Sequence, residues 1–214
     1  MNSQKPLAVI KQTGIIAILR KISQDQSLRV VEALAKAGVT AVEVTFNTPD
    51  AGRIIAAIAN RFAGSVYPGA GTVTEPSQVI EAKESGAQFI LAPNTDEAVI
   101  RMAQQAGLLM TPGAFTPSEV AQCARLGCQL IKLFPVSSAG PQYVKDLRGP
   151  FDTLNFLPVG GVDLTNAAAF IKAGAAAVGV GGGLVQNEML ARGDYAAVTD
   201  LGKRFLDAIA SARS

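Results

Sequence analysis

Lys132 combines a reactive side chain with apolar surroundings, since it lies in the segment LIKLFP at 130–135. Side chains alternate between the two faces of a β-strand, so Lys132 faces inward if Ile131 and Leu133 pack on covering helices. Desolvation disfavours the charged ammonium, and a neutral amine can attack a ketone to form a Schiff base. We therefore predict a nucleophilic Lys132. The alternative is a strand-end lysine that reaches solvent or pairs with a buried acid.

Glu43 is the second candidate, in the segment AVEVTF at 41–46. The same alternation sends Val42 and Val44 to the helices and Glu43 to the interior, where a carboxylate must be paired or protonated. The sequence contains no histidine, so acid–base chemistry falls to carboxylates, lysine, tyrosine or cysteine. We predict that Glu43 is the general acid–base residue. A structural ion pair with Lys132 is the alternative.

Two glycine runs end the last predicted strands, VGGV at 159–162 and GVGGG at 179–183. Bare backbone N–H groups at such ends, together with a helix N-terminus, are suited to hold phosphate. We predict that the phosphate-binding residues are Gly160, Gly161, Gly182 and Gly183. Tight turns also require glycine, which is the alternative reading of each run alone.

Three further residues lie at the ends of predicted strands. Arg20 comes after GIIAIL at 14–19, where a cation can clamp an anion, although a solvated loop arginine fits equally well. Thr72 follows small residues that leave room for a ligand. Pro93 either forms a pocket wall or simply ends its strand. We predict that all three contact the substrate.

A repeated unit positions these residues: an amphipathic helix ends in glycine, and a short apolar strand follows. The glycines are Gly38, Gly86, Gly107, Gly127 and Gly174. Each is predicted to be a left-handed cap. Residues with the character of helix N-caps are Ser23, Asp50, Thr95 and Thr116.

Further strands near 14–19, 67–73 and 155–161 bring the predicted total to eight. Alternating strands and helices imply a parallel sheet, and eight units without a second domain favour a closed barrel. We predict an α/β fold, a single (β/α)8 TIM barrel domain over residues 1–214, with a short leading helix before Thr13. Function in such barrels sits at the C-terminal ends of the strands, where the residues above lie.

Composition argues against several classes of protein. A net charge of +2 from 19 basic and 17 acidic residues gives no reason to expect a nucleic acid partner. No apolar run has the length of a membrane span or signal peptide, so we expect a soluble cytoplasmic protein without a membrane partner. Cys123 and Cys128 are predicted to be free thiols. The lack of histidine removes most catalytic zinc and iron sites, and we expect neither metal nor cofactor.

The motifs together resemble those of the 2-keto-3-deoxy-6-phosphogluconate (KDPG) aldolase family, which includes 6-phosphogalactonate and 4-hydroxy-2-oxoglutarate aldolases. They are AVEVTFNTPDA, PGAGTV, FILAPN, TPGAFTPSE, LIKLFP, GPQYVKDLRGPF, FLPVGGV and VGVGGGLV. The resemblance runs in order from about residue 13 to the C-terminus. It implies a homotrimer of (β/α)8 barrels and a metal-free class I aldolase that forms pyruvate and glyceraldehyde 3-phosphate from a phosphorylated keto acid.

Residue by residue, the resemblance makes Lys132 the Schiff-base lysine and Glu43 the acid–base residue. It places Thr72 and Pro93 around the pyruvate moiety. The phosphate loops match at Gly160, Gly161 and Gly182.

Three positions depart from the family pattern. Asn47 stands where many members have an arginine that binds the pyruvate carboxylate, and we hypothesise that Arg20 replaces it. Val159 replaces a threonine common in phosphogluconate-specific members, and both Val159 and Asn47 look more like the phosphogalactonate branch. Gly182 replaces a frequent phosphate-binding serine, but its backbone N–H remains.

The expected reaction is cleavage of 2-dehydro-3-deoxy-6-phosphogluconate through a Schiff base on Lys132. Alternatives within the family are the 2-dehydro-3-deoxy-6-phosphogalactonate and 4-hydroxy-2-oxoglutarate aldolases. A more remote alternative is a sugar-phosphate isomerase or epimerase without a covalent step. A barrel that only binds a sugar phosphate or a protein is the alternative outside enzymology.

Overall fold

Strands and helices alternate along the chain in the computed structural model, which describes residues 4–213. The strands are β1 (Ile15–Leu19), β2 (Ala41–Thr45), β3 (Tyr67–Gly71), β4 (Phe89–Leu91), β5 (Leu109–Thr111), β6 (Gly113–Ala114), β7 (Leu130–Leu133), β8 (Asn155–Pro158) and β9 (Val178–Val180). The helices are α1 (Gln4–Thr13), α2 (Gln24–Ala37), α3 (Ala51–Arg61), α4 (Pro76–Glu84), α5 (Glu97–Gln105), α6 (Pro117–Arg125), α7 (Gly140–Arg148), α8 (Ala167–Lys172), α9 (Asn187–Arg192) and α10 (Tyr195–Arg213). No helix in this range is both long and apolar enough to span a membrane.

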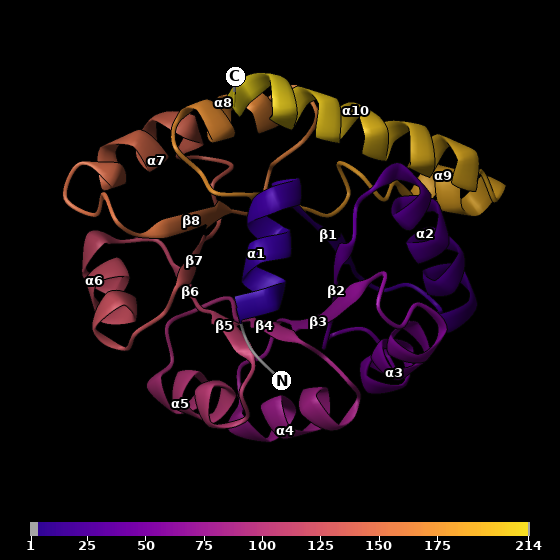
Figure 1. Ribbon diagram of the computed structural model, residues 1–214, viewed down its shortest axis with the longest axis horizontal. Coiled ribbons are helices and arrows are strands. Elements are labelled where there is room, and N and C mark those ends of the chain that lie inside the picture. The colour runs from indigo at the N-terminus through magenta and orange to yellow at the C-terminus, as the bar shows by residue number, and fades with distance from the viewer. Residues whose placement is uncertain (1–3, 214) are drawn as a thin grey trace.

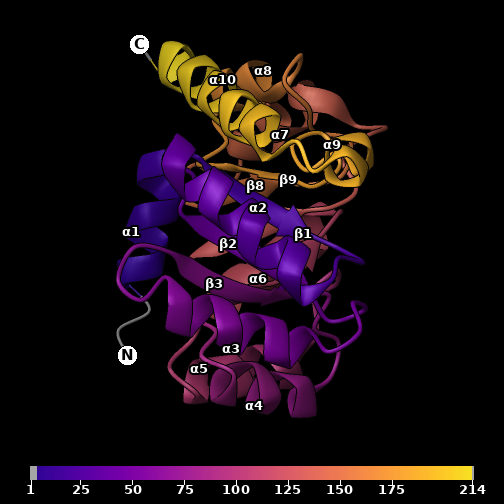
Figure 2. The same cartoon turned by 90° about the vertical axis from the view of Figure 1, so that its right-hand side faces the viewer.

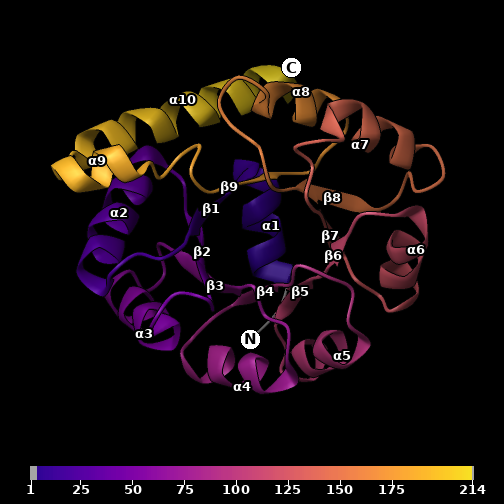
Figure 3. The same cartoon turned by 180° about the vertical axis from the view of Figure 1, so that it is seen from behind.

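All strand pairs are parallel and fall into two curved sheets, β5-β4-β3-β2-β1-β9 and β6-β7-β8. The predicted strand at 106–113 is divided into β5 and β6, because Pro112 has no N–H to donate to a ladder. Several contacts join the sheets. The Lys132 N–H donates to the Pro112 carbonyl at 2.9 Å, the Ala176 N–H donates to the Phe156 carbonyl at 3.0 Å, and Val159 bridges to Gly179. The α/β class and parallel strands are confirmed, with the strands inside a ring of helices (Figures 1 and 3).

Buried apolar side chains separate into two layers. The outer layer lies between strands and helices and contains the predicted outward residues Val42, Val44, Ile131 and Leu133. The inner layer lies on the opposite face of the strands and contains Leu130. The alternation read from the sequence is therefore confirmed for β2 and β7.

Helix α1 confirms the predicted leading helix and places Leu7 and Ile10 in the inner layer. It covers one end of the strands, whereas α9 lies at the opposite end (Figure 2). The guanidinium of Arg213, at the end of α10, donates to the carbonyls of Lys11, Gln12 and Ala176 at 2.8–3.0 Å. The two ends of the chain are thus tied together beneath the strands.

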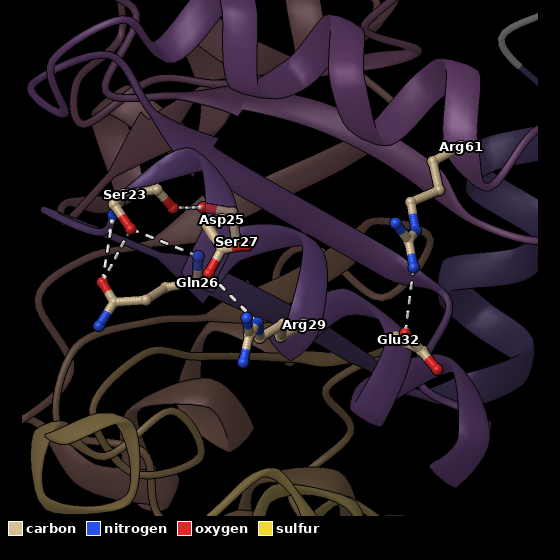
Figure 4. A network of polar contacts seen from close by, with 7 residues as sticks. All are labelled: Ser23, Asp25, Gln26, Ser27, Arg29, Glu32 and Arg61. Atoms are coloured by element: carbon tan, nitrogen blue, oxygen red, sulfur yellow. Dashed lines mark hydrogen bonds and ion pairs between the residues drawn. The ribbon is translucent and has the colours of Figure 1, made fainter. Parts of the chain in front are cut away.

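Local capping follows the sequence at most helix ends. Ser23 forms a capping box with Gln26 at the start of α2, and an ion pair joins Arg61 of α3 to α2 (Figure 4). Thr116 forms a second capping box, and Gly38 ends α2 with a left-handed φ of 96°.

One predicted N-cap, Thr95, is wrong, and a second, Asp50, holds the N-cap position of α3 without a side-chain bond. The N-cap of α5 is Asp96, which accepts from the Val99 N–H, whereas the hydroxyl of Thr95 donates to the Gly113 carbonyl instead. Asp50 precedes α3 but makes no side-chain cap bond, because its backbone is left-handed with a φ of 56°.

Candidate active site

Lys132 projects from β7 into the inner layer and is only 4% exposed. Its Nζ lies 4.7 Å from the centroid of the Phe134 ring, at the C-terminal end of the strand. Burial lowers the pKa of Lys132, the charge of Glu43 opposes that shift, and the charge of Arg20 adds to it. The net direction favours the neutral amine, which is the nucleophilic form.

Glu43 projects from β2 into the same interior and is 1% exposed. Burial raises the pKa of Glu43, and the charges of Lys132 and Arg20 partly offset that effect. The carboxylate and the amine are thus within electrostatic reach of each other. Among residues 4–213, however, the ion pairs with N–O distances up to 4.0 Å do not include this couple. An acid and an amine that both favour neutrality suit proton exchange better than a structural ion pair.

The end of β3 is shaped around this carboxyl group. A β-carbon at Gly71 would overlap Glu43 Oε1 and lie 2.6 Å from its Cγ, so the absence of a side chain at Gly71 makes room for Glu43. Thr72 follows directly with a φ of 58°, a conformation that is rare for a β-branched residue and is concentrated at functional sites. Thr72 is thus the next residue after the glycine that makes room for Glu43.

The predicted phosphate loops meet in one pocket of about 420 Å³ at the ends of β8 and β9. Its lining includes Arg20, Gly160, Gly161, Gly182 and Gly183. Gly160 and Gly161 have left-handed φ values of 88° and 81°. A β-carbon at Gly183 would lie 2.7 Å from the Val162 carbonyl, so the two loops approach closely only because Gly183 has no side chain. A pocket of backbone amides beside a guanidinium is chemically suited to an anion.

Phe134 connects this pocket with the amine, because it lines the pocket and lies beside Lys132 Nζ. Side-chain alternation in the segment LIKLFP puts Phe134 on the same face of the chain as Lys132. Val159 also lines the pocket and is 5% exposed.

This pocket is not lined by Thr72, Pro93 or Asn47. Pro93 is half-buried at the end of β4, where a β-carbon at Gly113 would overlap the Pro93 carbonyl. Asn47 lines a separate cavity of about 690 Å³ together with Lys21 and Arg53. The structure thus joins Arg20, but not Asn47, to the glycine loops.

Sequence reasoning missed Thr111, a fully buried residue at the end of β5. Its hydroxyl has no hydrogen-bond partner among residues 4–213. The available signal was alternation in the segment LLMTPG, which turns Thr111 to the same face as Leu109.

Comparison with known proteins gives a family match along most of the chain. Residues 7–201 match the family described as "Aldolase: KDPG and KHG aldolase". The 2-dehydro-3-deoxy-6-phosphogalactonate aldolase of Escherichia coli K12 is 41% identical over 172 residues, which cover 79% of this chain and 83% of that protein. The 2-dehydro-3-deoxy-phosphogluconate aldolase of Pseudomonas aeruginosa is 29% identical over 204 residues, covering 95% of this chain and 92% of that protein.

Solved structures show the same similarity. The structure named "Native KDPGal structure" superposes with a TM-score of 0.87 at 35% identity, covering 93% of this chain and 95% of that chain. KDPG aldolase from Legionella pneumophila, with pyruvate captured as a covalent carbinolamine, gives a TM-score of 0.86 at 28% identity, covering 92% and 96% of the two chains.

Proposed function

Because the chain belongs to the KDPG and KHG aldolase family and is a carbon–carbon lyase, we propose that it cleaves 2-dehydro-3-deoxy-6-phosphogalactonate to pyruvate and glyceraldehyde 3-phosphate. The observation that carries the proposed mechanism is the buried amine of Lys132 within electrostatic reach of buried Glu43. The galactonate epimer is preferred over the gluconate epimer first expected, because the phosphogalactonate relative is 41% identical and the Pseudomonas phosphogluconate relative 29%. Val159 and Asn47 favour the same branch.

In the proposed mechanism, Lys132 Nζ attacks the C2 carbonyl carbon of the substrate, and loss of water gives a protonated imine. Glu43 relays the protons of these steps. Its carboxylate then takes the proton of the C4 hydroxyl while the C3–C4 bond breaks and the bonding electron pair moves toward the imine nitrogen. C4 leaves as the aldehyde carbon. The remaining enamine is protonated at C3 and hydrolysed to pyruvate.

We propose that the pocket at the ends of β8 and β9 holds the phosphate through backbone N–H groups of Gly160, Gly161, Gly182 and Gly183. Thr72 and Pro93 would line the pyruvate end. Arg20 can serve either end, because it lines the glycine pocket and also acts electrostatically on both interior charges.

Replacing Arg20 by Ala separates these two roles. A higher KM for pyruvate in the reverse reaction would assign Arg20 to the carboxylate, whereas a higher KM for glyceraldehyde 3-phosphate alone would assign it to the phosphate. An unchanged KM for both would exclude each role.

We also propose that the two sheets form one closed (β/α)8 barrel in a single domain. The Lys132–Pro112 hydrogen bond and the Val159–Gly179 bridge support closure, because they link the sheets at both junctions. The homotrimer stays a prediction from the family resemblance, and the cytoplasmic location stays a prediction from the sequence.

The decisive test measures kcat/KM for the phosphogalactonate and phosphogluconate epimers side by side, with 4-hydroxy-2-oxoglutarate as a third substrate. We expect the galactonate epimer to be cleaved fastest, and a preference for either other substrate would refute this assignment. Borohydride reduction with pyruvate should attach a three-carbon unit to Lys132. Lys132→Arg should abolish both the adduct and cleavage, whereas an isomerase without a covalent step would retain its activity.

A further inference from the structure

Two buried side-chain oxygens have no hydrogen-bond partner within residues 4–213: Glu43 Oε2 and Thr111 Oγ1. Thr111 is 0% exposed, so its hydroxyl has no access to bulk water. Native proteins pair nearly all buried polar atoms, and an exception calls for a physical reason. Both exceptions in this part of the chain lie on the inner face of the strands.

Strand geometry places Thr111, at the end of β5, one inward-facing step below Lys132. Leu109 lies in the inner layer and Met110 in the outer layer, so Thr111 turns inward again. Gly113 is the residue paired with Lys132, and Thr111 precedes Gly113 by one inward-facing position. The hydroxyl is therefore deeper than the backbone of Lys132, on the side that α1 covers.

The amine points the other way. Lys132 Nζ lies beside Phe134, toward the C-terminal ends of the strands where the glycine pocket opens. A substrate that enters from that end covers the amine from solvent. Hydrolysis of the product imine requires a water molecule at C2, and a polar group on the closed side of the interior can hold that water in place.

We propose that Thr111 is a positioning residue whose hydroxyl, together with Glu43 Oε2, holds the water that hydrolyses the imine on Lys132. This inference rests on the proposed Schiff-base function. A buried water normally makes two to four hydrogen bonds to polar groups that lack other partners, which is what these two oxygens offer.

Hydrolysis starts from the protonated imine on Lys132 and the carboxylate of Glu43. The water oxygen bonds to C2, the C=N electron pair moves to nitrogen, and Glu43 takes a water proton. Glu43 then returns that proton to the nitrogen. The C2–N bond breaks with its electron pair on nitrogen, and the C2 hydroxyl gives its proton back to Glu43. The products are the ketone, a neutral amine on Lys132 and a protonated Glu43.

The test replaces Thr111 by Val, which keeps the shape and removes the hydroxyl, and by Ser, which keeps the hydroxyl. We expect kcat for cleavage to fall about tenfold in Thr111→Val, the effect of one lost hydrogen bond in imine hydrolysis. KM should fall in parallel, because the slowed step comes after binding and cleavage. Thr111→Ser should return kcat to within about twofold of wild type. The melting temperature of Thr111→Val should not decrease, because the unpaired polar atom is removed. Thr111→Ala supplies a second variant without the hydroxyl and should share the kinetic defect.

A second readout isolates the hydrolysis step. Pyruvate incubated in deuterium oxide exchanges its C3 hydrogens while bound as enamine and imine. Slower hydrolysis in Thr111→Val lengthens that residence, so the first pyruvate released should carry more deuterium atoms per molecule than with wild type. A purely structural defect slows all steps together and leaves this distribution unchanged.

A wild-type deuterium distribution in Thr111→Val, or equal defects in the Val and Ser variants, would overturn the inference. Failure of the proposed function would differ from failure of this inference. Wild type itself would then show neither C3 exchange nor a borohydride adduct on Lys132.

Discussion

Gly71→Ala tests the position of the Glu43 carboxyl group without changing any group that takes part in the chemistry. The new methyl carbon would overlap Oε1 and lie 2.6 Å from Cγ, whereas ordinary contacts begin at 3.4 Å. The Glu43 side chain must therefore retreat by roughly 1 Å or more, and displacements of about 1 Å can cost on the order of a hundredfold in rate. We expect kcat/KM to fall about 10²-fold, equivalent to ~2.7 kcal/mol of transition-state stabilisation.

Stability should change little in this variant, because the obstacle is the end of a flexible side chain. An off-rotamer Glu43 would cost about 0.5–1.5 kcal/mol. The assay combines kcat/KM on the phosphorylated substrate with the melting temperature. Gly69→Ala, on the same strand, is the matched contrast. Its methyl carbon would overlap the Phe89 ring instead of the carboxyl group, so it should lower stability more and catalysis less.

A double-mutant cycle with Glu43→Ala tests whether Gly71→Ala acts through the carboxyl group. Once the carboxyl group is gone, Gly71→Ala has nothing to displace and should cause no further loss of activity. Full activity of Gly71→Ala would contradict the predicted displacement. Independent, additive losses in the double variant would show that Gly71 acts by another route.

Three further predictions follow from the charges and hydrogen bonds. The charge of Glu43 raises the pKa of Lys132, whereas the charge of Arg20 lowers it. The acid limb of pyruvate trapping by borohydride should therefore move to lower pH in Glu43→Gln and to higher pH in Arg20→Ala. Shifts in the same direction would contradict the arrangement of charges. Burial raises the pKa of Glu43 above the ordinary 4.5, so just above pH 4.5 the folded protein retains a proton that the unfolded chain has released. The protonated Glu43 therefore contributes to the unfolding free energy at low pH, and this contribution is lost as pH rises through the raised pKa. In urea unfolding, the unfolding free energy of Glu43→Gln relative to that of wild type should be higher at pH 8 than at pH 5. Arg213→Ala removes the bonds to Lys11, Gln12 and Ala176 and should lower the unfolding free energy by about 1 kcal/mol, with little change in KM. An equal loss in Arg204→Ala, an exposed arginine on the same helix, would show that these bonds contribute nothing specific.

The face of a strand that each reactive residue occupies can be predicted from local sequence alone. Lys132 and Glu43 were predicted to face inward because side-chain alternation is a property of the local backbone, and the structure has both residues buried there. The helix-ending glycine at Gly38 was read in the same local way and is confirmed by its left-handed φ.

Which of these groups lie together depends on the folded arrangement of distant segments. Arg20 joins the glycine loops and Asn47 does not, although both follow neighbouring strands. The room that Gly71 leaves for Glu43 and the unpaired hydroxyl of Thr111 were likewise invisible in the sequence. The physical reason is that alternation and capping depend on adjacent residues. Distances across the interior depend instead on strand register and packing between segments far apart in the chain.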